Sequence, residues 1–390
     1  MSNTFEATLS EILRKAFYAG DIPFGGVLSI LPDGKKLDVF EKGFLSESID
    51  TFSSGFWIAS LSKGIASVAA MILVEKRLIG LDDLVGEYIE QLKDLDVLEG
   101  FGDGETPLLR KARTPITLRH LLCHTAGFAY PFSNDLIANF AKTRGLPPTI
   151  SGKRAAYSIP LVSDPGSDWV YGISTDWLGQ VIEKVSGCSL DEFYKNNIFD
   201  PLGMKNTFFK APDDFLMRTM PLYRREDKNA FRRIELLVPQ NPEMVPAGAG
   251  LYSCPEDYLR FLEMLLREGR VGDIQVLEKS TVKALLEPAV VGQSVGCIES
   301  SNDELTLDYD PQPGVDKGWS LGFSVTLHDL PEGRKVGSFG WAGLSNIYYW
   351  VDPKSKLASI FYTQVLPFAD TGALRTLDKI EKAIYRFVNS

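Results

Sequence analysis

Residues 56–76 read FWIASLSKGIASVAAMILVEK, and the rest of the chain is organised around this stretch. The part after Lys63 is rich in alanine and aliphatic residues, which predicts a buried helix that begins at or just before Ser60 and ends around Gly80. Capping alone would explain a serine at a helix start, because its hydroxyl accepts from free backbone N–H groups. Lys63 lies one helical turn further on, beside the Ser60 hydroxyl. Apolar surroundings favour the neutral form of a lysine, which can take a serine proton, so Ser60 and Lys63 are candidate catalytic residues.

The composition narrows the class of protein. The 390 residues are 44% hydrophobic and 24% charged, which is typical of a globular protein with two domains or with one large domain and an insertion. A net charge of −10 argues against nucleic acid or an anionic membrane as a partner. There is no secretory signal in the first residues and no apolar run of membrane-spanning length, so we expect a cytoplasmic protein. The four cysteines lie far apart in sequence, which predicts reduced thiols and no metal site or metal cofactor (Cys123, Cys188, Cys254 and Cys297).

The order of predicted elements indicates an α/β (α+β) fold. An amphipathic helix over 5–16 is followed by strands over 26–31 and 37–44. Beyond residue 205 we expect a helix over 255–266, strands over 321–327, 336–340, 346–351 and 358–363, and a closing helix over 374–387. These patterns predict one antiparallel sheet built from both chain ends and flanked by helices, formed by residues 1–85 plus 205–390.

Residues 86–204 read as an inserted helical domain, with the active site between the two domains. The predicted helices cover 116–122, 177–185 and 189–194, and loops are expected at 100–104 and 164–167. A further helical stretch is expected from Leu81 onward.

Two other patterns in the sequence resemble catalytic motifs. His120 and His124 have the i, i+4 spacing of metal ligands, but no glutamate lies between them and no third ligand presents itself, so we interpret them as structural. Gly292–Gly296 has the form G-x-S-x-G around Ser294, yet a polar, turn-like segment follows where a nucleophile elbow needs a helix. We therefore do not expect Ser294 to be the nucleophile.

Tyr171 is the candidate partner of Ser60 and Lys63. It stands at the N-terminal edge of a predicted helix, where a phenol beside a lysine can be poised to give up its proton. Taken alone, a tyrosine there is better explained by packing at a domain junction.

A set of motifs in a fixed order carries a family resemblance: Ser60-Leu61-Ser62-Lys63, Leu121-Leu122-x-His124-Thr125-x-Gly127, Tyr171-Gly172, Pro201-Leu202-Gly203-Met204 and Trp341-Ala342-Gly343. The chain resembles the serine β-lactamase/penicillin-binding-protein-like superfamily, in its class C-like branch of family VIII carboxylesterases and acyltransferases. Within that branch it is most similar to the fungal lovastatin-type acyltransferases of secondary metabolism. The resemblance implies a β-lactamase/transpeptidase-like fold with Ser60 as nucleophile and with Lys63 and Tyr171 as the general-base pair. It also implies an oxyanion hole made by the backbone N–H groups of Ser60 and Leu344.

Two departures from this pattern bear on the substrate. Trp341-Ala342-Gly343 stands where penicillin-recognising relatives carry Lys-Thr-Gly, and Tyr171-Gly172-Ile173 replaces the Tyr-x-Asn of class C enzymes. Because both changes remove polar groups that a β-lactam needs, we expect weak or no β-lactamase activity. We expect instead a roomy apolar substrate pocket that includes Trp341, Gly343, Phe128, Tyr130 and Trp319.

The expected activity is transfer of an acyl group through Ser60, from an ester or thioester to an alcohol of a small secondary metabolite. A carboxylesterase that hydrolyses such esters is the alternative, and a non-catalytic scaffold of the same fold is a further one. The partners implied are a small-molecule ester and alcohol, with a thioester on an acyl carrier protein as a candidate donor.

Overall fold

The computed structural model of the protein describes residues 2–46, 54–236 and 238–390. The predicted domain 1–85 therefore includes residue 1 and residues 47–53, which lie outside the described residues. The chain opens with helix α1 (Ser2–Tyr18). Its buried residues Phe5, Leu9, Leu13 and Ala16 recur at helical spacing and form one apolar face.

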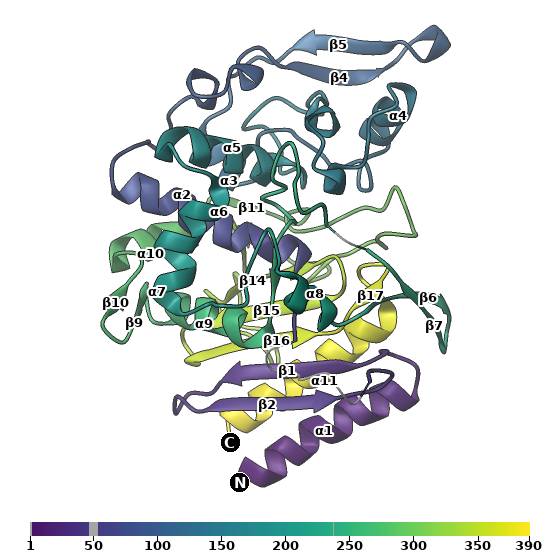
Figure 1. The fold of residues 1–390 in the computed structure, drawn as a ribbon, viewed down its shortest axis with the longest axis vertical. Coiled ribbons are helices and arrows are strands. Elements are labelled where there is room, and N and C mark those ends of the chain that lie inside the picture. The colour runs from purple at the N-terminus through teal and green to yellow at the C-terminus, as the bar shows by residue number, and fades with distance from the viewer. Residues whose placement is uncertain (1, 47–53, 237) are drawn as a thin grey trace.

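An eight-stranded antiparallel sheet is built from both ends of the chain, as the sequence predicts (Figure 1). Its order is β11-β12-β13-β14-β15-β16-β1-β2. The pairing of β16 with β1 joins the two chain ends, with Gly26 of β1 opposite Tyr362 of β16. The strands are β1 (Gly25–Ile30), β2 (Lys36–Glu41), β11 (Val290–Gly292), β12 (Lys317–Trp319), β13 (Ser324–Val325), β14 (Phe339–Gly343), β15 (Ile347–Asp352) and β16 (Leu357–Tyr362).

Helices cover the central strands. Every residue of β1, β15 and β16 is buried, so both faces of the sheet are covered there. Helix α9 (Pro255–Leu266) packs on β16, β1 and β15, while α1 packs on β2 and beside α11 (Thr371–Val388). Phe5 and Phe387 join the two terminal helices by stacking at a centroid distance of 4.0 Å.

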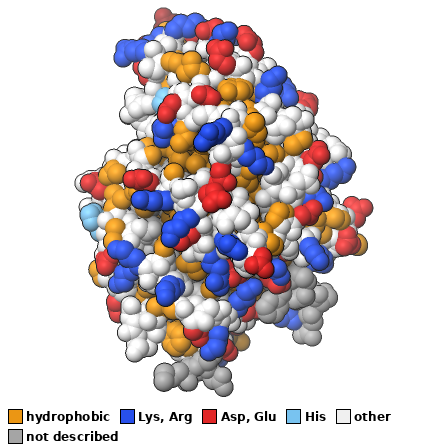
Figure 2. All heavy atoms as spheres, turned by 90° about the vertical axis from the view of Figure 1, so that its left-hand side faces the viewer, with side chains coloured by type: hydrophobic (Ala, Val, Ile, Leu, Met, Phe, Trp, Pro, Cys, Tyr) orange, Lys and Arg blue, Asp and Glu red, His pale blue; other side chains and the backbone are white. Residues whose placement is uncertain are grey.

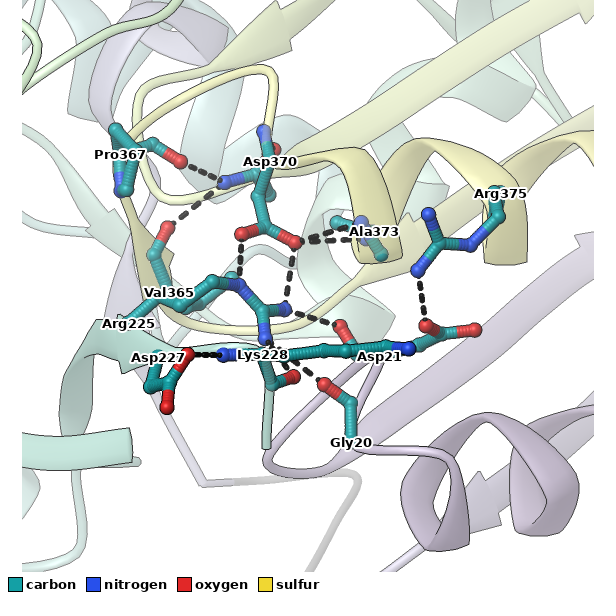
Figure 3. A network of polar contacts seen from close by, with 12 residues as sticks. Gly20, Asp21, Arg225, Asp227, Lys228, Val365, Pro367, Asp370, Ala373 and Arg375 are labelled. Atoms are coloured by element: carbon teal, nitrogen blue, oxygen red, sulfur yellow. Dashed lines mark hydrogen bonds and ion pairs between the residues drawn. The ribbon is translucent and has the colours of Figure 1, made fainter. Parts of the chain in front are cut away.

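A polar network anchors the C-terminal helix to the start of the sheet (Figure 3). Asp370 caps α11 by accepting from the N–H groups of Gly372 and Ala373 at 2.9 and 3.0 Å. Its carboxylate also binds the Arg225 guanidinium, which donates in turn to the backbone oxygens of Gly20 and Asp21 at 2.9 and 2.8 Å. Arg225 lies on β6 (Leu222–Asp227), so three distant segments meet at one ion pair.

Residues 86–204 are mainly helical but contain a hairpin that the sequence interpretation missed. The helices are α3 (Leu118–Leu122), α4 (Asp135–Thr143), α5 (Ser174–Ser186), α6 (Leu190–Tyr194) and α7 (Asp200–Leu202). Strands β4 (Asp96–Phe101) and β5 (Pro107–Lys111) pair around the loop expected at 100–104 and form the upper edge of Figure 1. The usual alternation of apolar and polar residues is not visible in these two strands. Leu108 and Leu109 are both about half exposed, and the register shifts between Leu98 and Gly100.

Helix α2 (Ser62–Glu75) ends earlier than predicted. Arg77 takes a left-handed conformation with φ 58°, and Leu78 N–H bonds back to Leu73 O at 3.0 Å. Such a helix end is normally signalled by glycine, and arginine gives no such signal. The helical stretch expected from Leu81 is a turn, in which the Asp83 carboxylate accepts from Gly80 N–H at 2.7 Å.

Short elements complete the fold. They are β3 (Phe56–Trp57) paired with β8 (Tyr252–Ser253), β6 and β7 (Ala230–Ile234) with β17 (Val365–Leu366), β9 (Arg270–Val271) with β10 (Ile274–Gln275), and helices α8 (Asp213–Met217) and α10 (Lys279–Leu286). Basic and acidic side chains are interspersed on the face shown in Figure 2. Among the described residues, no helix is long and apolar enough to cross a membrane.

Candidate active site

Ser60 lies on a strained turn at the head of α2. The 3-10 turn Ala59–Leu61 precedes the helix, and Ala59 has a φ of 48°, a conformation that a non-glycine residue seldom adopts. The Ser62 hydroxyl holds this turn by donating to Ala59 O at 2.6 Å. Ser62 also accepts from the N–H of Leu251, which fixes the turn to the neighbouring chain. Strain of this kind is concentrated at functional sites.

Lys63 lies beside Ser60 as the sequence predicts. The residue is 2% exposed, and its Nζ is 3.1 Å from Ser60 Oγ. Nζ also donates to Tyr130 Oη at 3.1 Å and to Gly248 O at 2.9 Å. An ammonium has three protons, and here three oxygens from separate segments receive them.

A buried carboxylate supports this arrangement from behind. Asp176, in the first turn of α5, accepts from Gly248 N–H at 3.1 Å and from Tyr130 Oη at 3.4 Å. Burial raises the pKa of Asp176 to about 6, against the opposing effect of the Lys63 charge. A Cβ atom on Gly248 would lie about 3.2 Å from both Lys63 Nζ and the Asp176 carboxylate, so a larger residue would press on both groups.

Tyr171 reaches the site through the segment that precedes it. Val170 N–H bonds to His124 O at 2.8 Å, and His124 itself has a φ of 56°. A Cβ on Gly172 would lie 2.1 Å from Phe128 O, so the chain after Tyr171 passes directly against the neighbouring segment. The Tyr171 ring faces Lys63, with Nζ 4.8 Å from the ring centroid.

Trp341 of β14 completes the group around Tyr171. Its indole Nε1 donates to the Tyr171 hydroxyl oxygen at 3.0 Å. A donor aimed at this oxygen stabilises negative charge on it when the phenol gives up its proton. The residue that replaces the lysine of Lys-Thr-Gly therefore supplies a hydrogen bond as well as an apolar surface.

The end of β14 lies against the turn that carries Ser60. A Cβ on Gly343 would lie 2.7 Å from Ile58 O, so glycine permits this close approach. Leu344 follows at once, and Ser60 and Leu344 line the same two cavities. The oxyanion hole made by the N–H groups of these two residues stays a prediction.

Two cavities of unequal size meet at Ser60. The larger has a volume of about 410 Å³ and is lined by Tyr130, Trp57, residues of α4 and the loop 146–150. The smaller, of about 20 Å³, is lined by Tyr171, Trp341, Gly343 and the side chains of Ile298 and Phe368.

Two of the predicted pocket residues lie in the core, outside the lining of both cavities. Phe128 stacks on Trp177 at a centroid distance of 6.4 Å. Trp319 packs edge-on against Trp341 at 4.6 Å and donates to Leu122 O. Both rings are surrounded by other side chains, and they support the walls of the site from behind.

Of the competing candidates, only His124 lies within this geometry, where its buried ring packs against Tyr171 at a centroid distance of 5.0 Å. Ser294 is exposed and is followed by a turn. His120 caps α3 together with Thr117, and burial lowers its pKa. Burial, with the charge of Lys63, holds the pKa of His124 well below its usual value, so this ring is neutral.

In the described part of the chain no group of three or more His, Cys, Asp or Glu side chains is arranged to hold a metal ion. The four cysteines are free.

Sequence reasoning missed the support of Lys63 by Asp176 and Gly248. Asp176 reads as an ordinary first-turn acid of a helix, and Gly248 belongs to a run of small residues at 247–250. The available signal is that Tyr171 and Asp176 both lie near the start of α5, which places the two residues at the same end of this helix.

Comparisons with known proteins point to one family. The beta-lactamase family matches residues 51–382. The monacolin J acid methylbutanoyltransferase of Aspergillus terreus is 29% identical over 345 residues, covering 84% of this chain and 81% of that protein. The lovastatin esterase of Penicillium rubens is 28% identical and covers 80% of each chain. The solved structure of a simvastatin synthase (LovD) mutant from Aspergillus terreus superposes with a TM-score of 0.84 at 27% identity, covering 98% of this chain and 96% of that one.

Proposed function

Since the chain belongs to the beta-lactamase family, we propose that it is a serine acyltransferase that passes an acyl group through Ser60 to the hydroxyl of a small secondary metabolite. The observation that carries this proposal is the 3.1 Å contact between Lys63 Nζ and Ser60 Oγ beside a cavity of about 410 Å³. The methylbutanoyltransferase relative supports transfer onto an alcohol.

In the first half-reaction the Ser60 oxygen attacks the carbonyl carbon of an ester or thioester. Tyr171 acts as a phenolate, which the charge of Lys63 and the N–H of Trp341 stabilise, and it becomes a phenol when it takes the serine proton. The N–H groups of Ser60 and Leu344 bind the oxyanion. The leaving thiol or alcohol departs with the proton that Tyr171 returns to it, which leaves Ser60 acylated.

In the second half-reaction an incoming hydroxyl gives its proton to Tyr171 and attacks the acyl-enzyme. Collapse of the tetrahedral intermediate releases the new ester, and the proton returns to Ser60. A thioester on an acyl carrier protein would suit the first step, because a thiol leaves more readily than an alcohol.

Two parts of the chain share this work. Ser60, Lys63 and Trp341 come from the unit 1–85 plus 205–390, whereas Tyr130, Tyr171 and Asp176 come from 86–204. We propose that these are the two domains of the protein and that the substrate binds between them.

Intact-mass measurement of acylation tests the proposal. Wild type incubated with p-nitrophenyl esters of two to four acyl carbons is expected to gain the mass of one acyl group, and Ser60→Ala is expected to gain none. Ser294→Ala is the matched control, since it alters the exposed serine of the other motif and should be acylated like wild type. Acylation that persists in Ser60→Ala would contradict the proposal.

Hydrolysis is the second candidate function, and the lovastatin esterase relative favours it. Transfer and hydrolysis share the acyl-enzyme and differ only in the nucleophile that reaches it. Supplying a thioester with and without an alcohol separates the two. A transferase yields mainly the new ester, whereas an esterase yields the free acid in both mixtures.

A further inference from the structure

The turn between β14 and β15 carries Leu344, and Asn346 sets its geometry. Gly343 pairs with Ile347, so the hairpin loop consists of residues 344–346. Hairpin loops of this length commonly end with a residue in the left-handed conformation. Asn346 takes that conformation, with a φ of 61°, and its N–H bonds to Gly343 O at 2.9 Å. Asparagine adopts it more readily than most residues, so the local sequence favours this turn.

Two backbone N–H groups beside the cavities lack acceptors. Among the residues that the structure describes, neither the N–H of Leu344 nor that of Ser60 makes a hydrogen bond to another part of the chain. Most backbone N–H groups of a folded chain are paired, so these two donors are available to an acceptor from outside the chain. A carbonyl oxygen that gains negative charge while Ser60 Oγ attacks its carbon is such an acceptor.

The Asn346 side chain is fully buried, and its amide uses both of its donors and both of its acceptor positions. Nδ2 donates to Val365 O at 2.8 Å and to Pro367 O at 2.7 Å. Oδ1 accepts from the Tyr348 hydroxyl at 2.8 Å and from Asp370 N–H at 3.2 Å. Val365, Pro367 and Asp370 lie close together where the chain enters α11 (Figure 3). The amide therefore fixes the end of the turn to the segment that precedes this helix.

The middle of the turn is joined to the segment that leads to Ser60. Ser345 is buried, and it accepts from Gln364 Nε2 at its hydroxyl and from Val365 N–H at its carbonyl oxygen, at 2.7 and 3.1 Å. Longer contacts of 3.4 and 3.5 Å run from Gln364 Nε2 and Ser345 Oγ to Trp57 O. Trp57 stands three residues before Ser60. The same polar contacts thus locate the two free N–H groups relative to each other.

We propose that Asn346 is a positioning residue, whose buried amide aims the N–H of Leu344 at the oxyanion that forms when Ser60 attacks an ester. Asn346 lines neither cavity at Ser60, so it acts through the turn and not through the substrate. This inference rests on the proposed acyl-enzyme function. It deepens that function by assigning the placement of one oxyanion donor to a side chain that the reaction itself does not use.

A comparison of an oxygen ester with its sulfur analogue tests this role. An aimed N–H favours p-nitrophenyl acetate over O-p-nitrophenyl thionoacetate, because sulfur is the weaker hydrogen-bond acceptor. Asn346→Gly keeps the left-handed turn and removes the amide. Loss of one oxyanion donor costs about 100- to 1000-fold in kcat and a displaced donor costs less, so kcat/KM for the acetate should fall at least about tenfold. The kcat/KM for the thionoacetate should fall less than about threefold, which lowers the oxygen-to-sulfur ratio.

Two tyrosines at opposite ends of β15 supply a second variant and its matched control. Tyr348→Phe removes only the hydrogen bond to Asn346 Oδ1, so it keeps the fold if Asn346→Gly does not. It should lower the oxygen-to-sulfur ratio by a lesser factor. Tyr385→Phe removes an equally buried hydroxyl, which donates to Asp352 Oδ2 at 2.8 Å. That control should lose similar stability and keep the wild-type ratio, measured on the folded fraction.

The outcomes separate this inference from the function on which it rests. Equal losses for the two esters in Asn346→Gly would overturn the positioning role and leave the acyl-enzyme function standing. So would a wild type without preference for the oxygen ester, or the same fall of the ratio in Tyr385→Phe as in Tyr348→Phe. Absence of Ser60 acylation by p-nitrophenyl acetate in the wild type would overturn the proposed function itself.

Discussion

Lys63 is held by oxygens from three separate parts of the chain, and Asp176 controls two of the three contacts. The Asp176 carboxylate accepts from the Tyr130 hydroxyl and from the N–H of Gly248, whose carbonyl oxygen receives a Lys63 proton. The position of the lysine thus depends on a residue that does not touch Ser60. We regard Asp176 as a positioning residue.

A pH profile tests this role. The pKa of Asp176 is raised to about 6, so the carboxylate loses its charge as the pH falls through this value, and kcat/KM for ester cleavage should fall with it. Lys63, Tyr130 and Tyr157 are the titratable groups around it, and burial raises the pKa values of both tyrosines far above this range. Asp176→Asn should have at least about tenfold lower kcat/KM at pH 8 and no acid limb near pH 6. An unchanged acid limb in the variant would show that another group titrates.

Stability should follow the opposite trend. A carboxyl whose folded-state pKa lies above its ordinary value favours the fold in its protonated form. This contribution is complete below the ordinary pKa of an aspartate and is lost as the pH rises through about 6. Midpoints of urea unfolding measured from pH 5 to 8 should decline for wild type, and the Asp176→Asn variant should lack this part of the decline.

Trp341 offers a second test at the residue scale. Trp341→Phe keeps an aromatic ring but removes the N–H that binds Tyr171 Oη, so kcat/KM should fall by about 10- to 100-fold. Trp350→Phe on the adjacent strand is the control, since among the described residues its indole N–H has no partner. That variant should lose stability and keep its kcat/KM, which is measured on the folded fraction. Equal losses of kcat/KM in both would mean that ring size is the cause.

At the scale of elements, the ion pair between Arg225 and Asp370 fastens hairpin β6–β7 to the N-terminus of α11. Asp370 is 2% exposed and Arg225 17%, so removing the arginine leaves a buried, unpaired carboxylate. Arg225→Ala should therefore lower the free energy of unfolding by about 3 kcal/mol, measured by urea denaturation.

The same hairpin contains a matched control. Arg232 pairs with Glu226 while both side chains are about half exposed, and Arg232→Ala should change the unfolding free energy by less than about 0.5 kcal/mol. Similar losses in the two variants would contradict the distinction between the buried pair and the exposed one.

Elements with strong periodicity could be predicted from the sequence, and elements defined by distant contacts could not. Helix α9 begins and ends as predicted, because Pro255 and the acids of its first turn mark its start and an apolar stripe marks its buried face. Hairpin β4–β5 was missed because its exposed leucines break the alternation of apolar and polar residues that predicts a strand. Ser60, Lys63 and Tyr171 carry their signal in local motifs, whereas Gly248 joins them only through folding.

At the scale of the whole molecule, the sheet depends on its last strands. A chain ending at residue 356 lacks β16, which pairs with both β1 and β15, and should be found in the pellet with no Ser60 acylation in the soluble fraction. A chain ending at residue 388 retains every strand and all of α11 and should remain active. An active enzyme ending at residue 356 would show that the sheet forms without β16.

The pairing of Gly26 with Tyr362 also has a consequence for biosynthesis. A ribosome adds roughly 5–20 residues per second, so the first hairpin leaves the exit tunnel well before its partner strand exists. For something like 20 seconds to a minute of translation, one edge of that hairpin has no neighbour and can pair with other nascent chains. Production of this protein should therefore respond more to chaperone supply and lower temperature than to changes around Ser60.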